Sequence, residues 1–123
     1  MVDYGHAETA LGETLQAVGQ HAYADPLTYP GHLDLTAHVD FQSLSRAVEA
    51  MGTIGFGPIE QSQFLRRLGI ERRAAALKTK APRAADIELA LERLTGRNRD
   101  AMGELFKVVA FAHPSVGAPP GFE

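Results

Sequence analysis

The sequence of 123 residues contains no cysteine. This absence excludes disulfide bonds and metal sites with thiolate ligands, and it gives no information about the redox compartment. No apolar run is long enough to cross a bilayer, so we expect no membrane span. Lys and Arg form no block with interleaved aromatic residues, which argues against nucleic-acid binding. The remaining composition, with 45% hydrophobic and 22% charged residues and a net charge of -3, suits one globular domain.

The first six residues, Met1 to His6, have the pattern of a strand end followed by a turn. Strand ends of this kind follow several apolar residues, and none precede them here. Two interpretations remain open: a short edge strand at a natural N-terminus, or a chain that begins inside a larger fold. No basic and apolar leader precedes these residues, so we expect no signal peptide and a cytoplasmic location.

Residues 34–41 form the stretch around which the chain is organised. They contain two carboxylates, one imidazole and one hydroxyl, and the apolar residues before Asp40 alternate as in an extended segment. Asp40 then precedes a helical pattern, where its carboxylate can accept hydrogen bonds from free backbone N–H groups. The stretch is therefore predicted to deliver polar groups to a helix N-terminus, a common place to bind a polar ligand.

Apolar spacing and breaker residues predict the remaining elements. Residues 105–112 are nearly continuously apolar, so we expect a strand at the centre of a sheet, with neighbours on both sides. The chain offers too few strands for a complete doubly wound sheet, and part of the fold is expected to lie elsewhere. We expect strands at 14–18 and 53–56, helices at 41–51, 60–68, 71–80 and 86–94, a strand break at Pro58, a helix stop at Pro82, an irregular segment at 21–31 and a loose Pro- and Gly-rich tail at 114–123.

Several polar patterns have both a functional and an ordinary interpretation. The His and Asp residues between positions 21 and 40 match no established metal spacing, so turn and cap roles are favoured over a metal hydrolase and no metal is predicted. Three carboxylates, Asp3, Asp34 and Asp40, could converge to hold a guanidinium, or they could be turn and cap acids. The basic stripe is favoured as a solvated helix face, with an acidic partner surface as the alternative. That stripe consists of Arg66, Arg67, Arg72, Arg73, Lys78 and Lys80.

Seven blocks in this order and spacing resemble the C-terminal part of the MidA-like class I S-adenosylmethionine-dependent methyltransferases. These are bacterial relatives of the mitochondrial complex I assembly methyltransferase, which modifies a protein arginine. The blocks are Asp3-Tyr4-Gly5-His6, Thr14-Leu15-Gln16-Ala17-Val18, Ala24-Asp25-Pro26-Leu27, residues 34–41, Gly57-Pro58-Ile59-Glu60-Gln61, residues 64–70 and residues 102–108.

The resemblance implies an α/β fold: the C-terminal part of a Rossmann-like methyltransferase sheet with flanking helices, with residues 1–123 as a single fragment. Residues 1–4 would end a middle strand, and residues 53–57 and 105–112 would be the last two strands, the final one antiparallel. The family's glycine-rich adenosylmethionine loop lies N-terminal to the first block. The triplet Gly52, Gly55 and Gly57 does not replace it, because the first glycine serves as a helix stop.

The implied function is protein arginine methylation linked to respiratory complex I assembly, in an enzyme that uses S-adenosylmethionine. The chain alone is expected to bind no cofactor and to be inactive without the other half. Its partners would be a protein substrate or a separate N-terminal half, and a homodimer could form through exposed sheet surface at Val2 and residues 105–112. A split-enzyme subunit and a non-catalytic protein-binding remnant remain alternatives. The predicted site comprises catalytic Asp3, Asp34 and Asp40 and substrate-binding Tyr4, Gly5, Thr36 and His38.

Overall fold

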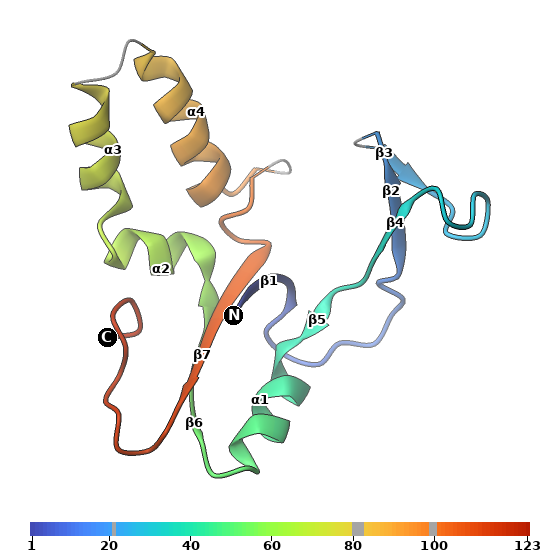
Figure 1. Ribbon diagram of the computed structural model, residues 1–123, viewed down its shortest axis with the longest axis horizontal. Helices are drawn as coiled ribbons and strands as arrows, with labels where there is room; N and C mark the ends of the chain where they lie inside the picture. Colours follow the sequence, from blue (N-terminus) through green and yellow to red (C-terminus); the bar gives the residue numbers. More distant parts are fainter. Residues whose placement is uncertain (21, 80–82, 99–100) are drawn as a thin grey trace.

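The computed structural model describes residues 1–20, 22–79, 83–98 and 101–123. Within these ranges it contains strands and helices in an α/β arrangement, as predicted (Figure 1). The strands are β1 (Val2–His6), β2 (Gln16–Gly19), β3 (Ala22–Ala24), β4 (Asp34–Thr36), β5 (Val39–Asp40), β6 (Ile54–Glu60) and β7 (Phe106–Ala112). The helices are α1 (Phe41–Glu49), α2 (Gln61–Arg67), α3 (Ile70–Lys78) and α4 (Ala84–Thr95).

The larger sheet has the strand order β5-β1-β7-β6. Strand β1 is parallel to β5, and β7 is antiparallel to both β1 and β6. The first residues therefore form a middle strand and residues 106–112 an antiparallel one, as predicted. Because β1 and β6 run in the same direction, their carboxyl ends lie at the same edge of the sheet, which is where open α/β sheets bind ligands.

The apolar core lies where β7 and the start of α1 meet the rest of the sheet. Val108 and Val109 of β7 retain 4% and 1% of their surface, and Phe41, the first residue of α1, retains none. Helix α1 contacts β1 and β6, while α2 contacts β6 and β7, and α3 and α4 pack together beyond it. We call this larger sheet and its four helices the body.

A second sheet, with strand order β3-β2-β4, extends away from the body (Figure 1). We call it the arm; its described residues are 16–20 and 22–36. Residues 21–31 were predicted to be irregular, but Ala22–Ala24 form β3 by antiparallel pairing with β2. This prediction was wrong because the turn residues Asp25 and Pro26 come only after the short strand, and pairing with β2 decides its conformation. His21 lies outside the described residues.

The strand predicted at 53–56 does not stop at Pro58, so that expectation was also wrong. Strand β6 continues to Glu60, with a register shift against β7 between Phe56 and Ile59. Proline is tolerated at a bulge of an edge strand, because no ladder hydrogen bond is required from its nitrogen there. The helix predicted at 71–80 starts at Ile70, while its predicted end at Lys80 and the stop at Pro82 lie outside the described residues.

The last residues of the chain return to the body. The Phe122 ring lies 5.3 Å from that of Phe64 and 6.3 Å from that of Phe56, measured between centroids. A guanidinium nitrogen of Arg67 donates a hydrogen bond of 3.3 Å to the carbonyl oxygen of Gly121. The tail that the sequence predicted to be loose thus makes ring contacts and a hydrogen bond at its end.

Among the helices of the described residues, none combines the length and the apolar character that crossing a bilayer requires.

Candidate functional site

Two cavities lie at the carboxyl edge of the larger sheet, and strand β7 separates them. Phe106 lines one cavity and Lys107 lines the other. The cross-strand partners of these residues on β1 are Tyr4 and Asp3, respectively. Because successive side chains of a strand point to opposite faces, the two cavities lie on opposite faces of the sheet.

The cavity between the arm and the body has a volume of about 470 Å³. It contains four of the seven residues that the sequence predicted for the site, and they come from β1, β4 and the segment between β4 and β5. We call it the arm–body cavity. Its lining includes Tyr4, Asp34, Thr36 and His38, together with Gln16, Val18, Tyr23, Arg93, Met102, Leu105 and Phe106.

Aromatic rings fix the wall of this cavity on the body side. The Tyr4 ring meets the rings of His38 and Phe106 edge to face, at centroid distances of 5.6 and 5.5 Å. The backbone N–H of His38 donates a hydrogen bond of 3.2 Å to the hydroxyl of Thr14. Such edge-to-face contacts limit the rotamers of all three rings, so this side of the cavity is formed before any ligand arrives.

His38 and His6 share a contact between ring nitrogens. Nδ1 of His38 lies 3.1 Å from Nε2 of His6. Burial lowers the pKa of His38 below its ordinary value of 6.5, and the positive charges of His6 and Lys107 lower that pKa further. His38 is therefore a neutral imidazole at neutral pH, a form able to accept a proton.

Gly5 has a packing role that the structure makes visible. A Cβ added to this residue would lie 2.1 Å from the carbonyl oxygen of Val39 and 2.7 Å from its nitrogen. Only glycine allows β5 to approach β1 this closely. This close contact holds the segment with His38 against Tyr4, whereas the predicted substrate-binding role of Gly5 itself stays a prediction.

The three carboxylates predicted as catalytic do not converge. Asp34 lines the arm–body cavity, whereas Asp3 lies on the opposite sheet face, where its Oδ1 accepts the backbone N–H of Tyr4 at 2.9 Å. Asp40 is the N-cap of α1, where its carboxylate accepts the backbone N–H of Ser43 at 3.0 Å and the hydroxyl of Thr9. The turn and cap interpretation describes the contacts of Asp3 and Asp40.

The hydrogen bonds at Asp40 also stabilise its ionised carboxylate. The backbone N–H of Ser43, followed by the Ser43 hydroxyl, lowers the pKa of Asp40 below its ordinary value. These contacts tie the loop before the arm to the start of the first helix. Asp40 thus acts in this structure as a junction between Thr9 and α1.

Sequence reasoning missed the cavity residues that come from distant elements, chiefly Arg93 of α4 and Phe106 of β7. Arg93 lies in an ordinary helical pattern and Phe106 in an apolar run, so neither carries a local signal. A backbone hydrogen bond of 2.8 Å from the N–H of Met102 to the carbonyl oxygen of Arg93 helps to hold these two elements together. That contact brings the end of α4 next to the start of β7.

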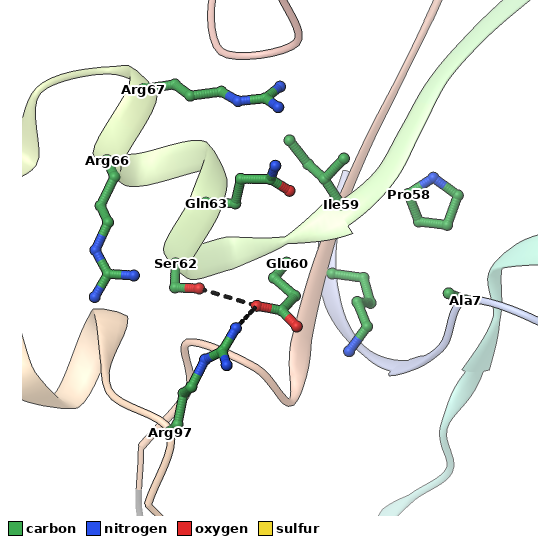
Figure 2. Close-up of a pocket in the computed structure, with 10 residues that line it drawn as sticks. Ala7, Pro58, Ile59, Glu60, Ser62, Gln63, Arg66, Arg67 and Arg97 are labelled. Atoms are coloured by element: carbon green, nitrogen blue, oxygen red, sulfur yellow. Dashed lines mark hydrogen bonds and ion pairs between the residues drawn. The ribbon is translucent and has the colours of Figure 1, made fainter.

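The second cavity has a volume of about 660 Å³ and lies beside α2 and the end of β6 (Figure 2). Glu60 occupies its middle and accepts hydrogen bonds from the guanidinium of Arg97 at 3.1 Å and the hydroxyl of Ser62 at 3.3 Å. We call it the basic cavity. Its cationic lining residues are Arg66, Arg67, Arg97 and Lys107.

The described residues provide no metal cluster of three or more His, Asp or Glu side chains. They also provide no glycine-rich loop between a strand and a following helix, the arrangement that cradles a nucleotide cofactor. Gly52 lies between α1 and β6 and adopts the left-handed conformation of a helix stop, whereas Gly55 and Gly57 lie within β6.

Comparison with known proteins finds similarity to methyltransferases. Residues 1–59 match a family model described as "Putative S-adenosyl-L-methionine-dependent methyltransferase". The rat protein arginine methyltransferase NDUFAF7, which is mitochondrial, is 39% identical over 114 residues, covering 89% of this chain and 25% of the relative. The mitochondrial homologue from Caenorhabditis elegans is 44% identical over 77 residues, covering 63% of this chain and 18% of the relative.

Two crystal structures from Burkholderia thailandensis share the fold. One superimposes with a TM-score of 0.85 at 33% identity, covering 98% of this chain and 34% of the other. The second, bound to S-adenosyl-homocysteine, gives 0.82 at 34% identity and covers 98% and 33%. These matches support a place for the chain in the MidA-like family of S-adenosylmethionine-dependent methyltransferases. It corresponds to a C-terminal portion of these proteins and spans about a quarter of the length of the rat relative.

Proposed function

We propose that this chain forms the acceptor side of a protein arginine methyltransferase that is linked to respiratory complex I assembly. In this proposal a separate N-terminal half binds S-adenosylmethionine, and this chain positions the arginine. The names of the rat and nematode relatives support the reaction class, and the Burkholderia thailandensis structure bound to S-adenosyl-homocysteine supports the cofactor. The observation that carries the proposal is the convergence of Tyr4, Asp34, Thr36 and His38 on one cavity at the carboxyl end of β1.

The arm–body cavity has the chemistry to hold a guanidinium. The Asp34 carboxylate can accept hydrogen bonds from two N–H groups of the planar guanidinium, and the rings of Tyr4 and Phe106 offer π faces to a cation. Arg93 lines the same cavity, and its positive charge disfavours the protonated form of a bound guanidinium. An acceptor nitrogen must lose a proton during methylation, so the positive charge of Arg93 favours the reaction.

His38 is the proposed recipient of that proton. Its lowered pKa keeps the ring neutral at neutral pH, and in the tautomer whose Nδ1–H donates to Nε2 of His6, Nε2 of His38 is the nitrogen that accepts the proton. Adenosylmethionine bound by the other half supplies the methyl group. The contribution of this chain is then alignment of the acceptor and removal of one proton.

The edge of β1 is the proposed docking point for the other half. Val2–Tyr4 pair with β7 on one edge, whereas on the other edge β5 pairs only with Gly5 and His6. The Val2 side chain is 51% exposed. A parallel strand from the cofactor-binding half would complete this edge; a second copy of this chain, giving a homodimer, is the alternative occupant.

An assay of the divided enzyme tests the proposal. The chain would be mixed with the cofactor-binding half of a family member, supplied as a separate polypeptide, and methylarginine formation on a mitochondrial or bacterial complex I preparation would be measured by mass spectrometry. Methylation is expected with both parts and not with either alone. Asp34→Asn is expected to lower the rate about 100-fold, the order of a lost catalytic interaction. The control Asp25→Asn changes a carboxylate in the arm that accepts the backbone N–H of Leu27, which an amide oxygen can also accept.

Three outcomes would contradict the proposal. Tight binding of adenosylmethionine to the chain alone, measured by titration calorimetry, would contradict the missing cofactor half. Equal losses of methylation rate in Asp34→Asn and Asp25→Asn would show that the arm–body cavity does not hold the acceptor. Stable association with the other half but no methylation would favour the alternative of a non-catalytic protein-binding remnant.

For location we propose the cytoplasm, on the resemblance to bacterial members of the family. The rat and nematode relatives are mitochondrial, so fractionation of cells that express the tagged chain is the relevant measurement. Recovery in an organelle fraction would contradict this location.

A further inference from the structure

The basic cavity lies on the sheet face opposite the proposed acceptor site, and the proposed reaction does not use it. Four of its ten lining residues are cationic, and Glu60 is the single carboxylate among them. The whole chain has a net charge of -3, so this positive lining is opposite in sign to the protein. A concave surface of one sign concentrates ligands of the other sign.

The positive charges in this cavity are only partly neutralised. Glu60 is shared with Arg97, and Arg66 pairs with Glu71 through side chains that are 48% and 65% exposed, where solvent weakens the pair. Arg67 and Lys107 donate to carbonyl oxygens, of Gly121 and Glu104, which are neutral acceptors. The cavity therefore retains an excess of positive charge with the chain folded.

The spacing of the cations favours an extended ligand over a compact one. In Figure 2, Arg66 and Arg67 point in different directions from α2, and Arg97 reaches Glu60 from the far side of the cavity. A small dianion such as phosphate could not contact all of them, and at the centre it would meet the like charge of Glu60. Carboxylates spaced along a peptide could reach the separate guanidinium groups and leave Glu60 with Arg97.

We propose that the basic cavity binds an acidic segment of a partner polypeptide. The anchoring residues are Arg66, Arg67 and Lys107, with Gln63 exposed on the cavity wall beside them. Arg66 and Arg67 belong to the basic stripe of the sequence. The proposal makes them part of a surface for an acidic partner, which the sequence alone favoured less than a solvated helix face. The proposal is independent of methyl transfer, because binding is measured on this chain alone.

Binding of a fluorescein-labelled hexaglutamate peptide, followed by fluorescence anisotropy at low ionic strength, tests the proposal. Hexaglutamate is expected to bind, hexalysine is not, and added salt is expected to weaken the complex. Gln63→Glu and Gln63→Lys change the charge of an exposed side chain that makes no hydrogen bond within the part of the chain that the structure describes, so both variants should fold. We expect Gln63→Glu to weaken binding and Gln63→Lys to tighten it, each about two- to fivefold.

Arg66→Gln removes one proposed anchor and is expected to weaken binding about two- to fivefold. The matched control is Arg72→Gln on α3, an exposed arginine of the same stripe that does not line the cavity. Circular dichroism verifies the fold of each variant.

Three results would overturn the assignment. Equal losses from Arg66→Gln and Arg72→Gln would indicate general attraction to basic helices. Displacement of the peptide by inorganic phosphate at the peptide's own concentration would indicate a small-anion site. Gln63 variants that both leave binding unchanged would place the peptide elsewhere on the chain.

Discussion

In the body, Phe41, Val108 and Val109 keep at most 4% of their surface exposed, whereas in the arm Tyr23 and Leu35 keep 74% and 62%. Among the described residues of the arm, only Ala17 is fully buried, so backbone pairing among β2, β3 and β4 contributes most of its order. Small sheets of this kind gain little from hydrophobic burial and tend to open locally. The body thus provides a rigid wall for the arm–body cavity, and the arm provides the wall that can adapt to a partner.

Phe41→Ala is expected to produce the largest effect, because it empties a fully buried site in the body. The free energy of unfolding should fall by about 3–5 kcal/mol, the usual cost of a phenylalanine cavity. The matched change in the arm is Leu35→Ala, which should cost less than about 0.5 kcal/mol because the side chain is largely in water. Urea unfolding followed by circular dichroism measures both, and similar losses would mean that the arm contributes to the core.

Gly5→Ala acts at the connection between the two regions. The added Cβ would collide with the Val39 backbone, which cannot move without disturbing β5, so we expect a loss of about 1–3 kcal/mol. Gly117→Ala is the control, because a Cβ there meets no atom within 4 Å. Thermal unfolding of both variants provides the measurement, and an unchanged melting temperature for Gly5→Ala would show that β1 and β5 separate freely.

Asp40 should make the junction sensitive to acid. Its folded pKa lies below the ordinary value, so its contribution to stability is present above that value and is lost as the pH falls through the folded pKa. Asp40→Asn keeps a capping oxygen and removes the titration, so its unfolding should depend less on pH in this range; Asp40→Ala loses both. Acid titrations followed by circular dichroism compare the three proteins. An unaltered acid midpoint in Asp40→Asn would argue against this assignment.

His38 should give the smallest effect, in a higher pH range. Its folded pKa lies below 6.5, so its contribution to stability is present above pH 6.5 and is lost as the pH falls through the lowered value. His6→Gln removes a positive neighbour and should raise the pKa of His38 towards 6.5, as followed by NMR of the imidazole protons. A pKa of His38 that does not move in His6→Gln would mean that the two rings are not coupled.

Local patterns predicted much of the body. The spacing of apolar residues located α1 and α4, Asp40 was recognised as a cap, and the apolar run at 105–112 was recognised as a central strand. The antiparallel direction of that strand came from the family resemblance. Strand β3 and the passage of β6 through Pro58 were not predicted, because pairing with β2 and a bulge against β7 decide them. The local sequences of both segments are typical of turns, and the contacts with β2 and β7 override that tendency.

The residues of the candidate site also divide into those that a local pattern predicts and those that only the fold brings in. Asp34, Thr36 and His38 were predicted because they lie in one polar stretch, and Tyr4 because it lies in a recognised block. Arg93 and Phe106 enter the cavity from elements far along the chain, so no local pattern could select them. The basic cavity combines α2 with the loop after α4 and the start of β7, and only the fold brings its charges together.

One strand, β7, divides the two proposed binding regions by the alternation of Phe106 and Lys107. A one-residue slip of β7 against its neighbouring strands would exchange the two faces, turning the ammonium group towards the arm and the ring towards α2. The register of β7 against β1 and β6 therefore determines the lining of both cavities at once.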